Sequence, residues 1–372
     1  MTTTIERAVD ERTYASYSRP LLWRLVMTRE FAIITVLITV FTYATGQIPN
    51  FDGPLTLYYL FLDTAPIMLI ALPMTLVIIT GEIDLSVASI MGLTSVMLGI
   101  GFSDVGLPMP VAILLALAVG AVCGGANGFL VAYVGLPSLA VTIGTLALYR
   151  GIAVGLLGTE AITDFPEYWT DLAKQRLVGD ELTGGAIDSY PVILIPFVVL
   201  LVAFVWLLHF SSFGRGVYEI GLNDEAARFS GVDVERTKMW LFVLSGVVSA
   251  FAGIYYTLRF GSARGDNAEY YELQVIAAVL LGGVSIFGGR GALHGVVAGV
   301  LLIGVLQSAM RLDGTSTNIA NIVIGLLLVG SVMLTSVLSW VSALTSGRAR
   351  REPPPPPHNP QQSAASDATR SH

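Results

Sequence analysis

Charged residues are scarce in this chain of 372 residues, where Asp, Glu, Lys and Arg together make up only 13%. A soluble domain carries about 25% charged residues. Apolar residues account for 54% of the chain, and apolar runs long enough to cross a bilayer recur along most of its length. The composition therefore excludes an ordinary soluble protein and predicts an all-α, polytopic membrane protein.

The sequence is equally poor in groups that carry out covalent chemistry. Its one cysteine, Cys123, lies in an apolar run and can form no internal disulfide. The four histidines are scattered, so the sequence offers no cluster of metal ligands. Neither of the two lysines follows a glycine, so the phosphate-binding motif G-x-x-x-x-G-K-[ST] is absent. We expect no metal or cofactor site in this chain, and no enzyme activity.

The apolar runs predict about ten membrane-spanning segments. Their approximate bounds are 31–46, 61–80, 85–101, 108–134, 138–157, 191–209, 237–258, 273–289, 292–310 and 317–343. An even number of spans places both termini on one side of the membrane. Proline and glycine within 61–80 and 108–134 would permit broken or re-entrant helices in those two segments.

The distribution of basic residues predicts the orientation. Of the 20 Lys and Arg residues, 14 lie on one face, which receives residues 1–30, the short turns near 81–84, 135–137 and 290, the loop 210–236 with Lys238 at its edge, and the C-terminal tail. Cytoplasmic loops carry an excess of such residues, so both termini and the loop 210–236 are predicted to be cytoplasmic. The acidic segment 158–190 is predicted to be an outer loop.

This pattern divides the chain into three parts. Residues 1–30 mix five arginines with acids and are expected to form a cytoplasmic arm rather than a signal peptide, because the first apolar run begins near Phe31. Residues 31–343 form the transmembrane domain. Residues 344–372 contain the proline run 353–357, and their low complexity predicts a disordered cytoplasmic tail.

The polar interval 210–236 contains a compact helical pattern. Asn223 can cap a helix, and Asp224 and Glu225 in its first turn suit the positive end of the helix dipole. Gly231 is suited to end the helix. The pattern predicts a short helix outside the bilayer, which is either a solvated loop helix or a helix that docks on a partner.

Two acidic residues, Glu82 and Asp84, lie between two apolar runs with almost no polar spacer. Acids so close to hydrocarbon face a cavity or a partner, which favours a gate or an element of a substrate path. The alternative is a short cytoplasmic turn in which Asp84 caps a helix that begins at Leu85.

Two further polar residues lie inside apolar segments. Asn127 follows Gly120 and Gly124, and small residues of this kind let helices approach closely. The buried Asn127 side chain requires a hydrogen-bond partner. Arg150 either has a buried partner or extends its charged end to the membrane interface.

Four separated motifs, in the same order along the chain, resemble the ribose-type permeases of ABC importers, a family that imports sugars and, in one branch, autoinducer-2. The motif GEIDLS at 81–86 is similar to the family hallmark GGIDLS, with Glu82 where a second glycine is usual. The other three motifs lie at 120–153, 223–232 and 272–291, and the resemblance covers about residues 64–333. The segment 260–264 resembles the autoinducer-2 and rhamnose branches.

The resemblance implies roles for two sets of residues. The helix after Asn223 would dock in a groove of a separate ATP-binding subunit, with Phe229 as apolar anchor, Arg228 at the rim, and Ala226 and Ala227 allowing close approach. The docking set is Asn223, Asp224, Glu225, Ala226, Ala227, Arg228, Phe229 and Gly231. The translocation path would include Glu82, Asp84, Ser86, Asn127, Thr142, Thr145, Arg150 and Gln274.

The same resemblance implies a permease subunit of a bacterial inner membrane, without its own ATPase site. ATP and Mg²⁺ would be bound by the partner ATPase, and the other partners would be an extracytoplasmic solute-binding protein and a second permease copy or paralogue, with no nucleic acid. The solute would be a pentose, a rhamnose-like deoxyhexose or autoinducer-2. The alternative is a stand-alone secondary transporter or channel, whose ion site would have to use Glu82, Asp84 or Arg150.

Overall fold

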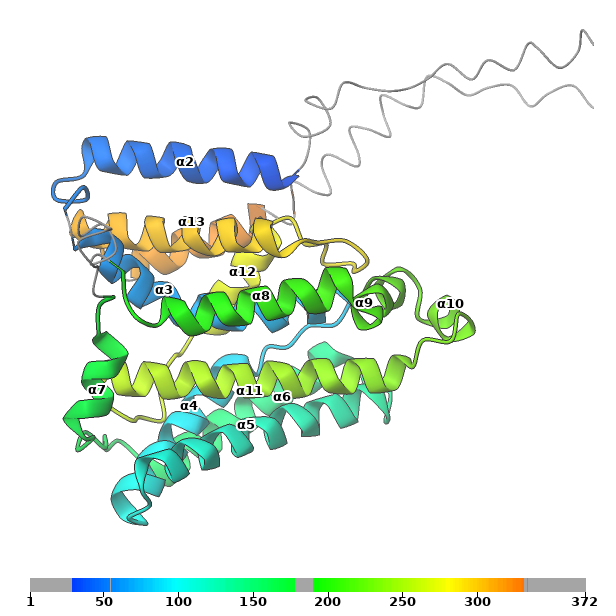
Figure 1. Cartoon of the computed structure of the whole chain (residues 1–372), viewed down its shortest axis with the longest axis horizontal. Helices are drawn as coiled ribbons and strands as arrows, with labels where there is room; N and C mark the ends of the chain where they lie inside the picture. Colours follow the sequence, from blue (N-terminus) through cyan, green and yellow to red (C-terminus); the bar gives the residue numbers. More distant parts are fainter. Residues whose placement is uncertain (1–28, 54, 178–189, 317, 331–332, 334–372) are drawn as a thin grey trace, which may run out of the picture. The chain divides into compact units, whose positions relative to one another are not determined.

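The computed structural model describes residues 29–53, 55–177, 190–316, 318–330 and 333, and the regular structure in these residues is helical, with two isolated β-bridges. This confirms the predicted all-helical class for the described part. The helices are α2 Arg29–Gln47, α3 Thr56–Ile79, α4 Val87–Gly99, the π-helical turn Ile100–Asp104, α5 Met109–Ala132, α6 Ser138–Leu157, α7 Glu167–Lys174, α8 Leu194–Phe210, α9 Ser212–Leu222, α10 Asp224–Phe229, α11 Val234–Phe260, α12 Tyr271–Leu281, α13 Leu293–Leu312 (Figure 1) and Asn318–Gly330.

Six helical segments are long and apolar enough to cross a membrane: α3, α4 with its π-helical turn, α5, α6, α11 and α13. The pair α8 and α9 makes a seventh if its two helices, bent by 68° relative to each other, form one broken span. The other predicted spans fall on the shorter apolar helices Phe31–Gln47, Tyr271–Leu281 and Asn318–Gly330. The structure therefore supports six or seven spans within the described residues.

The predicted span 273–289 is wrong as a single helix. The helix α12 has 11 residues and is about 17 Å long, which is too short for a hydrocarbon core of about 30 Å. The chain leaves the helix at Gly282, whose backbone N–H closes the last turn on Ala278, and Gly283 then adopts φ of +91°. A left-handed conformation of this kind ends a helix at a glycine.

The breaks that proline and glycine would permit in 61–80 and 108–134 are not formed, because α3 continues through Pro66 and Pro73 and α5 is continuous. The sharp bend comes instead between α8 and α9. There the Ser211 hydroxyl accepts a hydrogen bond from the Gly214 backbone N–H at 3.1 Å and caps α9. The segment 210–236 is thus largely helical, and α9 was missed by the sequence patterns.

The helix α3 lies at the centre of the bundle and packs against α8, α11, α12 and α13. In the most apolar 18-residue stretch of α3, 94% of the residues are buried. Because neighbouring helices cover α3 on all sides, it is apolar on every side. The corresponding buried shares of α5 and α6 are only 33% and 28%. These two helices therefore present broad apolar faces, with Leu114, Phe129 and Leu148 exposed, that suit lipid or another membrane subunit.

Glycines allow α5 and α11 to cross at close range. A Cβ atom on Gly124 would lie 2.2 Å from the Phe242 carbonyl oxygen, and one on Gly120 would lie 2.6 Å from that of Gly246. A Cβ on Gly246 would in turn meet the Gly120 carbonyl oxygen at 2.2 Å. Helix packing therefore accounts for the small residues in this part of the sequence.

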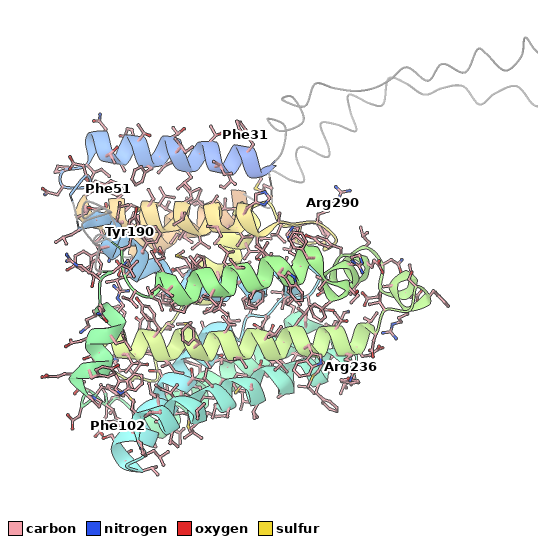
Figure 2. All side chains as sticks on the ribbon, in the orientation of Figure 1. Phe31, Phe51, Phe102, Tyr190, Arg236 and Arg290 are labelled. Atoms are coloured by element: carbon pink, nitrogen blue, oxygen red, sulfur yellow. The ribbon has the colours of Figure 1, made fainter. Side chains whose placement is uncertain are left out.

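The two ends of the bundle differ in what they carry. Arg236 and Arg290 lie at the end that carries α9 and α10, whereas Phe51, Phe102 and Tyr190 lie at the opposite end (Figure 2). The latter end includes α7, an amphipathic helix within the predicted outer loop 158–190. A β-bridge joins Ile162 in that loop to Ala263. The predicted N-terminal arm and C-terminal tail lie outside the described residues, apart from Arg29 and Glu30 at the start of α2.

Candidate functional site

The helix α10 is defined by caps at both ends, as its sequence predicted. The Asn223 side-chain oxygen accepts a hydrogen bond from the Ala226 backbone N–H at 2.9 Å. At the other end Gly231 adopts φ of +88° and donates its backbone N–H to Arg228, while Val232 donates to Ala227. This pair of bonds is a Schellman motif, which ends a helix at a left-handed glycine.

One face of α10 attaches the helix to its own chain. Ala227 is 2% exposed and packs with Ile220 of α9, Val234 of α11 and Val232. The expectation that Ala227 allows close approach of a partner is therefore wrong, because its side chain points into the permease. Its small size instead lets α10 pack closely against α9 and α11.

The opposite face of α10 is free of contacts that would bury it. Phe229 is 92% exposed, and Glu225 and Ala226 are exposed beside it. Arg228 forms an ion pair with Glu235 at 2.6 Å and remains half exposed. Phe229 is thus a large aromatic side chain on a capped helix of six residues that nothing in the described residues covers.

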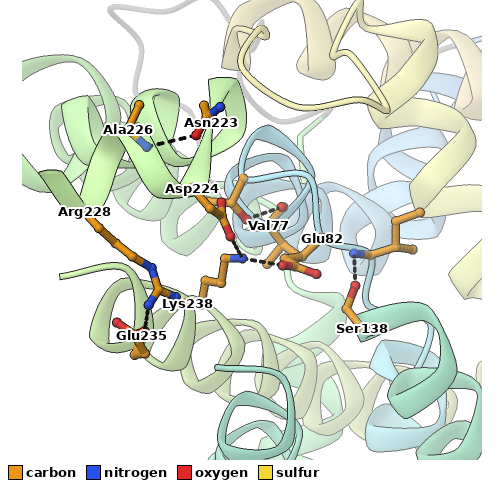
Figure 3. Close-up of polar contacts among 11 residues, drawn as sticks. Val77, Glu82, Ser138, Asn223, Asp224, Ala226, Arg228, Glu235 and Lys238 are labelled. Carbon is orange, nitrogen blue, oxygen red and sulfur yellow. Dashed lines mark hydrogen bonds and ion pairs between the residues drawn. The ribbon is translucent and has the colours of Figure 1, made fainter. Parts of the chain in front are cut away.

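Lys238, in the first turns of α11, connects α10 to the linker 80–86. Its ammonium group lies 2.7 Å from a Glu82 oxygen and 2.6 Å from an Asp224 oxygen (Figure 3). The Lys238 and Glu82 side chains are only 11% and 16% exposed, while Asp224 is 42% exposed. This Lys238 triad (Lys238, Glu82 and Asp224) ties the start of the exposed helix to the segment that joins α3 and α4.

Lys238 was not among the predicted site residues, which is the main omission of the sequence patterns. The signal was a lysine near the start of an apolar helix, since a cation at such a depth needs a partner. Its partners are 156 and 14 residues away in sequence (238 minus 82, and 238 minus 224), so spacing alone could not identify them.

Backbone contacts reinforce the connection between α9 and the end of α3. A Cβ on Gly221 would lie 1.8 Å from the Ile79 carbonyl oxygen, so the two backbones touch. The same Ile79 oxygen accepts a hydrogen bond from the Gly289 backbone N–H at 2.8 Å. Tyr218 donates its hydroxyl to the Gly291 carbonyl at 2.8 Å. Any displacement of α9 must therefore move the last turn of α3 and the loop 282–291.

Asp84 lies in a polar cluster at the centre of the bundle and is fully buried. One carboxylate oxygen accepts bonds from the Ser86 backbone N–H at 3.0 Å and the Ser86 hydroxyl at 2.6 Å, and the other accepts from the Ser245 hydroxyl at 2.8 Å. Asn127 donates to the Ser86 hydroxyl oxygen at 2.8 Å, and the Tyr149 hydroxyl lies 3.3 Å from the Asn127 side-chain oxygen. The cluster joins the linker to α5, α6 and α11.

The linker is also held by α6. Ser138 accepts a hydrogen bond from the Ile83 backbone N–H, and Thr142 donates to the Ile83 carbonyl, both at 3.1 Å. Among the described residues, Thr145 bonds to the Thr142 carbonyl of its own helix, at 3.5 Å. Thr145 thus lies on α6 between Thr142, which contacts the linker, and Tyr149 of the cluster, and in the described part of the chain it forms no hydrogen bond to the linker or to Asp84.

Arg150 is anchored through backbone carbonyls. Its guanidinium donates to Gly265 at 2.7 Å, to Asn267 at 2.8 Å and to Ala88 at 3.1 Å. The prediction that Glu82, Asp84 and Arg150 have partners rather than facing lipid is therefore confirmed.

Gln274 is buried elsewhere, in α12, where it accepts a hydrogen bond from Gln307 at 3.1 Å. The structure does not bring Gln274 or Arg150 into the Asp84 cluster, and the role of the set in transport stays a prediction.

A second charged cluster, the Asp63 triad (Asp63, Arg259 and Arg311), lies at the end of α11 remote from α10. Arg259 pairs with one oxygen of Asp63 and donates to the Leu62 carbonyl at 2.6 Å. Arg311 approaches the other oxygen at 2.5 Å. The triad joins α3, α11 and α13. Within the described residues no group of His, Cys, Asp and Glu is arranged to hold a metal ion.

Comparisons with known proteins identify the family to which this chain is similar. Residues 56–332 match the family described as "Branched-chain amino acid transport system / permease component". The chain is 40% identical over 281 residues to the autoinducer 2 import system permease protein LsrD of Yersinia enterocolitica, covering 74% of this chain and 82% of that protein. It is 39% identical to the protein of the same name in Yersinia pseudotuberculosis, covering 74% and 81%. No solved structure matches the chain.

Proposed function

The chain belongs to this permease family of ABC importers, and from that premise we propose that it moves a sugar or sugar-like solute, such as a pentose, a deoxyhexose or autoinducer-2, into a bacterial cell across the inner membrane. It is a multi-pass transport subunit without an ATPase domain. A separate subunit binds ATP and Mg²⁺ and drives transport. A solute-binding protein and a second permease, identical or related, complete the importer.

The exposed face of α10 docks in a groove of the ATP-binding subunit. The observation that carries this proposal is the 92% exposed Phe229 on a helix whose other face is fixed to the permease through Ala227. A helix of six residues is unstable alone, so its two caps and its buried face serve to present the exposed face in one orientation. Phe229 inserts into the partner, with Glu225 beside it.

Movement of the docked helix reaches the membrane by two routes. The Lys238 triad pulls on the linker 80–86 through Glu82, and the Gly221 contact pushes on the last turn of α3. The linker carries Asp84, whose hydrogen bonds extend to α5 and α11. Closure of the ATPase pair is thereby coupled to the helices that enclose the solute.

The docking proposal is tested with Phe229→Ser and Glu225→Arg in the complete importer reconstituted in liposomes. Both changes lie on the exposed face, so the permease should insert normally while co-purification of the ATPase and solute-stimulated ATP hydrolysis fall strongly. Tyr168→Ser on α7 is the matched control, because it also removes an exposed aromatic residue, at the other end of the bundle. Full binding and full coupling in both α10 variants would contradict the docking assignment.

The orientation follows from the Lys and Arg distribution, with both termini and α10 in the cytoplasm and ten membrane-embedded segments in all. Single cysteines at Ser230 and Thr170, in a Cys123→Ser background, should react with an impermeant reagent from opposite sides of the membrane. Reaction of both cysteines from the same side would overturn the orientation.

A further inference from the structure

A polar cavity of about 460 Å³ lies at the end of α11 remote from α10. Three aromatic side chains, Tyr256, Phe260 and Tyr271, form part of its lining. Three charged residues, Arg264, Asp266 and Glu269, come from the segment between α11 and α12. Its volume falls within the range of about 300–1,000 Å³ that is typical of sites for small molecules.

The wall of this cavity is held in place by buried polar contacts. Arg150 donates to the carbonyls of Gly265 and Asn267, at 2.7 and 2.8 Å. The Asn267 side chain donates to the Ser95 hydroxyl at 2.9 Å and to the Ser262 carbonyl at 3.0 Å. The segment is therefore fixed to α4 and α6 rather than being a loose connection.

The same segment contains backbone strain. Ala268 and Tyr270 adopt φ of +59° and +68°, in the left-handed region that residues with a Cβ atom seldom adopt. Each such residue costs on the order of 1 kcal/mol or more and persists only where its surroundings impose it. Strain of this kind is concentrated at ligand sites, and here both strained residues adjoin or line the cavity.

The lining combines groups that suit a neutral, polyhydroxylated solute. The Tyr256 ring contacts those of Phe260 and Tyr271, with centroids 4.6 and 5.8 Å apart, and forms an aromatic wall for C–H groups. Arg264 donates to both carboxylate oxygens of Asp266 at 2.8 and 2.6 Å. The hydrogen bonds from Arg264 hold the pKa of Asp266 below its usual range, so this carboxylate stays ionised and accepts hydrogen bonds at neutral pH.

The charged side chains that line the cavity offer an anion no unpaired cation. Arg264, Asp266 and Glu269 sum to a net charge of −1, and the only cation among them is already paired. A second cavity of about 540 Å³ between α5, α7, α8 and α11 is lined almost wholly by apolar side chains, and so offers a hydroxylated solute few hydrogen bonds. Of these two cavities, only the polar one has the chemistry to bind such a solute.

We propose that the cavity lined by Tyr256, Tyr271, Arg264 and Asp266 is an outer binding subsite of the permease itself, where a neutral polyhydroxylated solute of the sugar class is held before it moves between the helices. The assignment rests on the proposed function for its orientation, which puts this end of α11 outside. It adds a selectivity step in the membrane subunit, independent of the solute-binding protein.

Cysteine protection tests the subsite without the ATPase. The permease in lipid nanodiscs carries Cys123→Ser and Ser262→Cys, a conservative change in the cavity lining that keeps the backbone bonds of Ser262. An impermeant thiol reagent is added with D-ribose, L-rhamnose or autoinducer-2, and with ribose 5-phosphate as the anionic counterpart. At a concentration equal to its dissociation constant, a ligand occupies half of the sites and slows labelling about twofold.

We expect at least one neutral solute to slow labelling of Ser262→Cys in a saturable manner, and ribose 5-phosphate to leave it unchanged. Ser316→Cys is the matched control, since Ser316 is exposed and lies outside the cavity. Asp266→Asn should abolish the protection. The subsite is refuted if no neutral solute protects up to tens of millimolar, if every solute protects equally, or if Asp266→Asn changes nothing.

Uptake measurements on the complete importer distinguish failure of the proposed subsite from failure of the proposed transport function. Asp266→Asn should raise the KM for the transported solute several-fold with little change in kcat, as expected for loss of uniform binding, while Asp313→Asn should not. Normal uptake kinetics in Asp266→Asn would remove the subsite and leave the permease function intact. Failure of the unmodified importer to take up any of the three solutes would contradict the proposed solute class instead.

Discussion

Two ion-pair triads occupy the two ends of α11, and they are built in opposite ways. At the α10 end a single cation, Lys238, lies between Glu82 and Asp224, at 2.7 and 2.6 Å. At the other end a single carboxylate, Asp63, lies between Arg259 and Arg311. Each triad connects α11 to α3 or to the linker that follows it, so together they fix both ends of one helix pair.

The two triads differ in how many other contacts stabilise their members when one residue is removed. Lys238 is the shared partner of two carboxylates, so its loss leaves both unpaired. In the Asp63 triad Arg259 also bonds to the Leu62 carbonyl and lies over the Phe260 ring, and Arg311 is 58% exposed. The Arg311 contact with the second Asp63 oxygen also lacks hydrogen-bond alignment. The Lys238 triad therefore depends on one residue, whereas the Asp63 triad has alternatives.

Lys238→Met should produce the largest effect on stability. It leaves the Glu82 carboxylate, 16% exposed, without a cation, and breaking a buried pair in this way costs about 3–5 kcal/mol. The apparent melting temperature of the purified permease should fall, and ATP hydrolysis should no longer respond to solute. Adding Glu82→Gln to Lys238→Met should restore most of the stability but not the coupling. Equal melting of Lys238→Met and the unmodified protein would mean that the triad is a solvated surface contact.

Asp63→Asn should have a smaller effect. The central carboxylate is removed, but Arg259 keeps its bond to the Leu62 carbonyl and Arg311 remains in contact with solvent. The expected loss is about 1–3 kcal/mol, the range for one unsatisfied buried group. Melting temperatures of Asp63→Asn and Lys238→Met, measured under identical conditions, test which variant loses more stability. A larger loss in Asp63→Asn would mean that the Asp63 triad, and not the Lys238 triad, depends more on its central residue.

Arg311→Gln should have the smallest effect of the three. The side chain is 58% exposed, and an ion pair in such a position contributes less than about 1 kcal/mol. Melting should be nearly unchanged, and the remaining difference should shrink further at high salt. A drop comparable to that of Asp63→Asn would show that both arginines are needed to hold the end of α3 that carries Asp63.

Local signals in the sequence predicted the helical class, the caps of α10 and the presence of partners for buried charges. Asn223 and Gly231 act within a few residues of their own positions, so their roles follow from short-range geometry. The apolar runs located nearly every helix for the same reason. Their length did not reveal that α12 ends at Leu281, because a glycine-rich apolar stretch reads as one run whether or not it is helical.

Contacts between residues far apart in the sequence could not be predicted from its patterns. Lys238 finds Glu82, and Arg150 finds Gly265 and Asn267, only after the helices have packed. The inward position of Ala227 was also hidden, because both faces of α10 carry small or mixed residues and a helix of six residues shows no clear period. The bend before α9 depends on one serine cap, which periodicity does not detect.

The way Arg150 holds the segment before α12 has a consequence for how this permease can diversify. Its three bonds go to main-chain carbonyls, which every amino acid supplies. Side chains around the polar cavity, including Arg264, Asp266 and Glu269, can thus be exchanged without loosening the anchor. In the proposed subsite, a few substitutions in this segment would therefore alter the groups offered to a solute, while Arg150 preserves the position of the backbone.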